Sequence, residues 1–117
     1  MGTRVVGFIP PVVGTEGEFN TFRLGGFYAK NLSVGEEVFL LNEKERLVFG
    51  KAVVTGVETG KLGEMCAIHG DKNHTELEVS GDGRSAERLF HLLQKIHGPH
   101  IATPTKKTTV IYMRRLE

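Results

Sequence analysis

A chain of 117 residues with 39% hydrophobic and 25% charged side chains has the size and composition of one globular domain, so we expect residues 1–117 to form a single domain. Fifteen Lys and Arg against fourteen Asp and Glu give a formal charge of +1, which excludes a strong overall field for nucleic acid. No apolar run approaches the roughly 20 residues of a membrane-spanning helix, and the N-terminal segment is a poor secretory signal, so we expect a cytoplasmic protein without a membrane partner.

The first half of the chain predicts short strands separated by turns. Thr3–Ile9 is rich in β-branched and aromatic residues and ends at two prolines, which predicts a first strand. Asn20–Leu24 alternates apolar and polar residues and predicts a second strand, and Phe27–Leu32 has room for a single helical turn. Glu37–Leu41 and Leu47–Val57 are the clearest strand patterns, and the short charged loop between them predicts an antiparallel hairpin. Isolated glycines inside the second of these strands predict the bends that curve a sheet into a small barrel.

The second half of the chain predicts the helices and the last strand. Lys61–His69 has a weak helical spacing and predicts a short helical segment, whereas Asp71–Gly83 is polar and without periodicity, which predicts a mobile loop. Ser85–His97 carries its Leu and Ile residues on one helical face and predicts the main helix, with Ser85 as its amino-terminal cap. Thr108–Leu116 predicts a final strand that pairs with a central one. Five or six mostly antiparallel strands with one main helix predict an α+β fold with a curved or closed sheet.

The strand at Asn20–Leu24 holds the candidate site. Residues two apart on a strand point to the same face, so the Thr21 hydroxyl and the Arg23 guanidinium should project together. Arg23 can bind phosphate or carboxylate through its forked donors, or it can pair with a surface carboxylate such as Glu18 or Glu36. Thr21 can equally be a structural residue, because Thr is a good strand former.

Other candidate binding residues are aromatic or basic. Phe27 and Tyr112 could stack on a base, although Phe packs more often in a core. A basic cluster near the C-terminus could follow a phosphate backbone or be a solvated end: Lys106, Lys107, Arg114 and Arg115.

Metal, disulfide and nucleotide-motor chemistry is not indicated by the sequence. The five histidines lack the spacing that presents two imidazoles on one helical face, so we expect no metal: His69, His74, His91, His97 and His100. The single Cys66 cannot form an internal disulfide and is predicted to be a small buried hydrophobe. Neither a G-x-x-x-x-G-K phosphate loop nor a G-x-S-x-G elbow is present, and we expect no cofactor.

At TFRLG, followed about ten residues later by SVGEEVFLL, the sequence resembles ASCH domains of the PUA-like β-barrel superfamily. The order of elements agrees from Phe19 to Leu116 and ends in the strand TTVIYMRRL. The resemblance implies a small PUA-like β-barrel that binds RNA or a modified nucleoside in a cleft between the barrel and the main helix. In that interpretation Arg23 neutralises phosphate or orients the ligand, and Thr21 donates a hydrogen bond. The further candidate ligand-binding residues are Phe27, Lys30, Lys51, Asp71, Lys107, Tyr112 and Arg114.

Small bacterial acetylcytidine amidohydrolases of similar fold imply an alternative function. With the Arg of the ASCH signature G-x-K-x-x-E-x-R placed on Arg23, its Glu, which these enzymes replace by Thr, falls on Thr21 and its Lys falls on Glu18. A Thr nucleophile needs an adjacent base, and Glu18 would point to the opposite face of the strand, so the sequence favours a binding module over an enzyme. Other elements could supply an amine or a carboxylate: Lys30, Lys51 and Asp71. A protein-interaction domain without a nucleic-acid ligand is the third possibility.

Overall fold

A computed structural model describes residues 4–9, 12–79 and 81–116 of the chain. Thr3 and Pro10–Pro11, which bound the first predicted strand, lie outside the described residues. The secondary structure of the described part is β1 (Arg4–Phe8), β2 (Glu18–Leu24), α1 (Phe27–Asn31), β3 (Glu37–Asn42), β4 (Leu47–Lys61), α2 (Leu62–His69), the 3-10 turn η1 (Gly70–Lys72), α3 (Ser85–His97) and β5 (Lys107–Leu116). None of these helices is long and apolar enough to cross a membrane.

The strands form one mixed sheet in the order β1-β3-β4-β5-β2. The pairing of β1 with β3 is parallel and the other pairings are antiparallel, so the predicted α+β class, the β3–β4 hairpin and the central pairing of the last strand are confirmed. β4 runs to Lys61, four residues beyond the predicted end, because it pairs with β5 from Lys51 to Lys61. A register shift between Val54 and Gly56 bends this long strand.

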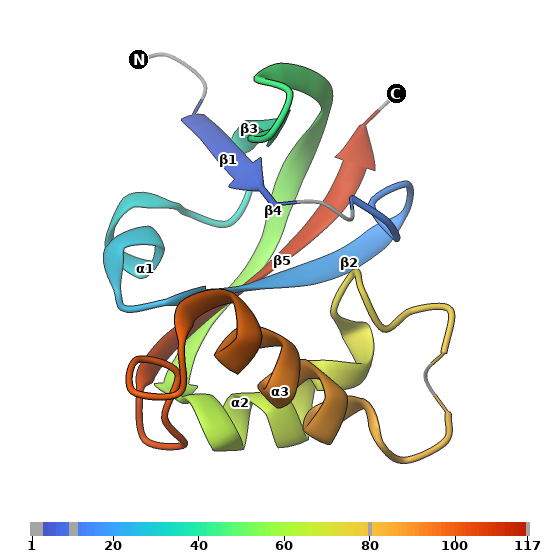
Figure 1. Ribbon diagram of the computed structural model, residues 1–117. Coiled ribbons are helices and arrows are strands. Elements are labelled where there is room, and N and C mark those ends of the chain that lie inside the picture. The colour runs from blue at the N-terminus through green and yellow to red at the C-terminus, as the bar shows by residue number, and fades with distance from the viewer. Residues whose placement is uncertain (1–3, 10–11, 80, 117) are drawn as a thin grey trace.

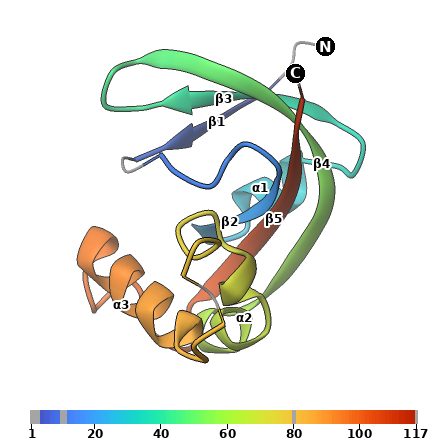
Figure 2. The same cartoon turned by 90° about the vertical axis from the view of Figure 1, so that its right-hand side faces the viewer.

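The sheet is curved like part of a barrel, and among the described residues no pairing joins its edge strands β1 and β2 (Figure 2). The predicted curved, barrel-like sheet is confirmed, and in the described part of the chain it is open rather than closed. Side chains on its concave side alternate with exposed ones, as in β3, where Val38 and Leu40 are buried and Glu37 and Phe39 are not. The buried residues of this first core are Val6, Phe8, Phe19, Leu32, Val38, Leu40, Ala52, Val54, Ile111 and Met113.

A second core lies where α2 and α3, side by side, pack against one end of the sheet (Figure 1). Its buried residues are Phe22, Leu62, Met65, Cys66, Leu89, Leu93, Ala102 and Val110. Burying a Leu side chain stabilises a fold by roughly 1.5 to 3 kcal/mol, so Leu89 and Leu93 hold α3 in place. Cys66 is confirmed as a buried hydrophobe, and burial raises the pKa of its thiol to about 11.

The main helix has the predicted bounds, but its predicted cap is wrong. Ser85 is the first helical residue, Arg84 occupies the cap position, and the Ser85 hydroxyl is buried without a hydrogen-bond partner among the described residues. The helix ends at Gly98, as its pattern predicted.

The predicted mobile loop Asp71–Gly83 is instead packed against the fold in its first part. Asn73 and Glu76 are almost fully buried. Arg88 on α3 binds Glu76 at 2.8 Å and Asp82 at 2.7 Å, which ties the segment to the helix. The polar composition of the segment does not indicate this packing, because it depends on pairs with residues outside the segment, such as His74 with Val13 and Glu76 with Arg88.

Candidate functional site

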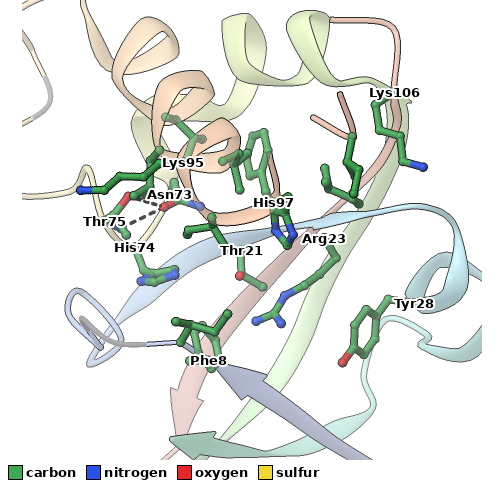
Figure 3. A pocket seen from close by; sticks show the side chains of 18 residues that line it. Phe8, Thr21, Arg23, Tyr28, Asn73, His74, Thr75, Lys95, His97 and Lys106 are labelled. Carbon is green, nitrogen blue, oxygen red and sulfur yellow. Dashed lines mark hydrogen bonds between the residues drawn. The ribbon is translucent and has the colours of Figure 1, made fainter. Parts of the chain in front are cut away.

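A cavity of about 760 Å³ lies between β2 and α3, within the size range of small-molecule sites (Figure 3). Much of its wall is apolar. Phe8 comes from the first core, and five residues come from the second core or pack against it: Phe22, Leu24, Leu89, Leu92 and Leu93. Three exposed residues complete this part of the wall: Ile9, Ile96 and Ile101. The other lining residues are Thr21, Arg23, Tyr28, Asn73, His74, Thr75, Lys95, His97 and Lys106. No Asp or Glu is among the described residues of the lining, so its fixed charges are cationic.

Strand β2 brings Thr21 and Arg23 to this cavity together, as their spacing predicted (Figure 3). β2 pairs with β5 over its full length, with Thr21 opposite Ile111 and Arg23 opposite Thr109, which fixes the direction of both side chains. Thr21 is only 3% exposed, and its hydroxyl takes part in no hydrogen bond between described residues. It is therefore free to donate to or accept from a ligand.

Among the described residues, Arg23 forms no ion pair and contacts aromatic rings instead. Its Cζ lies 5.0 Å from the Phe8 ring centroid and 5.7 Å from that of Tyr28. Its Nε is buried without a hydrogen-bond partner, and none of the ion pairs among the described residues includes it. Burial lowers the pKa of Arg23, while Tyr28 and the carboxylate of Glu43 act in the opposite sense. Since a guanidinium does not deprotonate in proteins, the site holds a fixed positive charge with unused donors.

A glycine turn after β2 places Tyr28 beside Arg23. Gly25 has a φ of +90°, a conformation that glycine adopts at little cost. Gly25 is held to β5 through both of its backbone polar groups, since Gly25 N donates to Lys107 O at 2.7 Å and Thr109 Oγ1 donates to Gly25 O at 2.8 Å. α1 therefore starts at a fixed position, and Tyr28 and Phe8 approach the guanidinium from different elements.

The segment after η1 places His74 next to Thr21. A parallel bridge joins Asn20 to Asn73, and the His74 N–H donates to Asn20 O at 3.0 Å, so the residues that follow in each segment, Thr21 and His74, are neighbours. His74 Nδ1 lies 3.0 Å from Val13 O. The segment that contains Val13 also passes close to His74. This approach requires glycine at position 14, because a Cβ on Gly14 would lie 2.1 Å from His74 O.

Burial and the Arg23 charge keep His74 neutral. Burial lowers its pKa to about 4, the charge of Arg23 adds to that effect, and the bond to Val13 opposes it. Burial and Arg23 also lower the pKa of His97, which reaches the cavity from α3. At neutral pH the cavity therefore contains the Arg23 guanidinium beside an uncharged His74 imidazole. Lys95 and Lys106 lie on opposite sides of the view, with their amines directed away from Arg23 (Figure 3).

Seven sequence-predicted site residues lie outside this cavity, and their roles stay predictions. Lys51 binds Glu37 at 2.8 Å on the sheet, and the Tyr112 hydroxyl bonds to His69 Nδ1 at 2.5 Å. Asp71 lines a separate cavity of about 370 Å³ near the start of α3. The other four are exposed: Phe27, Lys30, Lys107 and Arg114.

Most of the other polar lining residues have no direct sign in the sequence, but one signal is present. His97 follows Leu89 and Leu93 at intervals of four, so it lies on the same stripe of α3, at its exposed end, and lines the same cavity. His74 lies in a polar run whose burial depends on contacts with residues far away in the sequence. No local pattern could have indicated it.

No protein-family model matches the chain, and no curated protein matches its sequence. Two crystal structures share its fold. A protein of Enterococcus faecalis V583, described by the family model DUF984, superposes with a TM-score of 0.55 at 11% identity, over 90% of this chain and 64% of its own. A point mutant of the Zymomonas mobilis ASCH protein superposes with a TM-score of 0.54 at 11% identity, over 94% of this chain and 67% of its own. This chain thus spans about two thirds of the length of either protein, and it has the fold of an ASCH-domain structure.

Proposed function

We propose that the cavity between β2 and α3 binds a nucleotide of RNA or a modified nucleoside, with Arg23 on its phosphate or on a carbonyl oxygen. The observation that carries this proposal is the half-buried guanidinium of Arg23, whose buried Nε has no hydrogen-bond partner, in a cavity whose described lining contains no carboxylate. A buried donor without a partner costs roughly 1 to 3 kcal/mol, and more when it is charged. An anionic or carbonyl oxygen would remove that cost on binding.

The shape and chemistry of the walls support a ligand with a flat apolar part as well as an oxygen-rich part. Leu89, Leu93 and Ile96 of α3 offer an aliphatic surface opposite Thr21 and Arg23 of β2. A base could pack on the aliphatic side while its phosphate or carbonyl oxygen accepts hydrogen bonds from the guanidinium. Lys95 and Lys106, which also line the cavity, could contact neighbouring phosphates of a strand.

The test is a titration of single-stranded RNA and of nucleoside monophosphates against wild type, Arg23→Gln and Arg46→Gln at several salt concentrations. Arg46 is a matched control because it is an exposed Arg outside the cavity, in the loop between β3 and β4, and has no predicted binding role. We expect Arg23→Gln to weaken binding at least tenfold and to reduce the salt dependence of the affinity by the amount that corresponds to about one phosphate contact, with Arg46→Gln close to wild type. Equal affinities and slopes for wild type and Arg23→Gln would refute the assignment.

The amidohydrolase alternative has less support from the geometry. Thr21 reaches the cavity, but none of the hydrogen bonds among the described residues joins its hydroxyl to a Lys amine. Including acetylcytidine in the titration tests this function at the same time. Loss of the acetyl group in the presence of wild type, but not of Thr21→Val, would favour the enzyme over the binding module.

A further inference from the structure

His74 is a polar residue of the cavity whose hydrogen-bonding role is fixed by its surroundings. Its backbone N–H is bonded to Asn20 O, and its ring makes edge-on contacts with Phe8 and Phe19 at centroid distances of 5.1 and 6.3 Å. The residue is only 9% exposed and lines the cavity. The ring therefore cannot turn to suit a ligand without breaking these contacts.

The bond to Val13 determines which ring nitrogen carries the proton. A backbone carbonyl can only accept, so Nδ1, which lies 3.0 Å from Val13 O, must be the protonated nitrogen. In a neutral imidazole the other nitrogen, Nε2, then has a lone pair and no proton. Nε2 makes no hydrogen bond with any described residue. Its lone pair is an unused acceptor.

The neighbouring groups have different roles. Arg23 can only donate, and the Thr21 hydroxyl can donate or accept, so neither requires a donor on the ligand. A ligand that offers only acceptors would satisfy Arg23 and leave His74 Nε2 unpaired. An acceptor that is buried by the ligand without a partner carries a desolvation cost. The cavity should therefore favour ligands that present a donor to His74 Nε2.

We propose that His74 is a specificity-determining residue that accepts a hydrogen bond at Nε2 from an N–H or O–H of the ligand, while Arg23 binds an oxygen of the same molecule. This inference rests on the proposed function. The ligand class is thereby narrowed to nucleotides or modified nucleosides that present a donor beside the oxygen held by Arg23. The low pKa of His74 means that this acceptor role holds throughout the physiological pH range.

The test compares wild type, His74→Phe, His74→Gln and Arg23→Gln for binding of sulfate, UMP and CMP by calorimetry or NMR titration. Phe keeps a ring next to Phe8 and Phe19 but has no acceptor, whereas Gln retains one. Sulfate has oxygen acceptors and no donor, so its affinity should depend on Arg23 and change less than twofold in His74→Phe. At least one nucleotide should bind roughly tenfold more weakly to His74→Phe, with partial recovery in His74→Gln. His91→Gln, an exposed His on α3 outside the cavity, is the matched control and should bind like wild type.

A second comparison identifies the ligand group that bonds to His74. It uses pairs of ligands in which one member lacks a single donor group. UMP is compared with 3-methyl-UMP and with dUMP, and CMP with N4,N4-dimethyl-CMP. Removing the donor that bonds to His74 Nε2 should weaken binding to wild type and leave the affinity of His74→Phe unchanged. The inference is overturned if His74→Phe weakens sulfate and nucleotides equally, if every donor removal costs the same in both proteins, or if no nucleotide binds. Nucleotide binding that depends on Arg23 without any coupling to His74 would leave the proposed function intact and refute only the role of His74.

Discussion

The half-buried Arg23 and the buried His74 are two polar residues that the fold leaves incompletely satisfied. Arg23 Nε is buried without a partner among the described residues, and no carboxylate there forms an ion pair with the guanidinium. The rings of Phe8 and Tyr28 offset part of this cost, since a cation over an aromatic ring contributes about 0.5 to 2 kcal/mol. Polar groups retained at a cost to stability are typical of binding sites. The spacing of Thr21 and Arg23 could be predicted because it is a property of one strand, whereas their lack of partners could not.

The buried neutral state of His74 predicts how stability changes with pH. Its pKa is about 4 in the folded protein and near 6.5 when unfolded. Above pH 6.5 His74 is neutral in both states, so its protonation does not lower the free energy of unfolding there. As the pH falls below 6.5 the unfolded state takes up a proton that the folded state does not accept until about pH 4. We therefore expect the free energy of unfolding to fall by about 1 to 2 kcal/mol from pH 7 to pH 5 through His74 alone.

This dependence can be measured by urea unfolding of wild type, His74→Gln and His97→Gln at pH 7, 6 and 5. His97 acts with the same sign, because burial and Arg23 lower its pKa as well, so each variant should remove part of the slope. The exposed His91 supplies the control His91→Gln, which should keep the full slope. A profile for His74→Gln as steep as that of wild type would show that His74 is not held neutral.

At the scale of elements, the predictions succeeded where a pattern lies within one segment. The apolar stripe of α3 and the hairpin of β3 and β4 are local, and both occur as predicted. The segment Asp71–Gly83 was misjudged because its order depends on pairs distant in sequence, such as Asn20 with Asn73 and Arg88 with Glu76. The open sheet was also not predictable, since closure depends on whether two edge strands far apart in the chain meet.

Arg88 is the residue of α3 that we expect to hold this segment, and with it His74, in place. Its hydrogen bonds, with a smaller contribution from Arg84 N–H, lower the pKa of Asp82 to about 2. In Arg88→Gln this pKa should rise toward the ordinary value of 3.8, and the buried carboxylate of Glu76 should lose its cation. Local opening of the segment should become roughly tenfold more frequent.

Carboxyl titration by NMR and hydrogen exchange of the His74 amide, which is bonded to Asn20 O, measure the two effects. Arg84→Gln is the control, because the Arg84 side chain pairs with Glu87 at 3.4 Å and only its backbone reaches Asp82. If exchange at His74 is the same in Arg88→Gln and Arg84→Gln, the segment is held by its other contacts.

At the scale of the whole molecule, the cavity lies at the junction of the two cores. Phe8 belongs to the core inside the curved sheet, whereas Phe22, Leu89 and Leu93 belong to the core under the helices. All four line the cavity. A ligand in this position would contact both cores, and its binding energy would add to the stability of the sheet and of α3 together.

Ligand binding should therefore stabilise the whole fold rather than one element. A nucleotide at 100 times its dissociation constant should raise the free energy of unfolding by about 2.7 kcal/mol, seen as a higher melting temperature. Hydrogen exchange should slow both in α3, near Leu93, and in β2, near Thr21, because both form the cavity wall. Arg46→Gln should retain the stabilisation and Arg23→Gln should lose it. Protection of α3 with no change in β2 would instead place the ligand on the outer surface of the helix, away from Arg23.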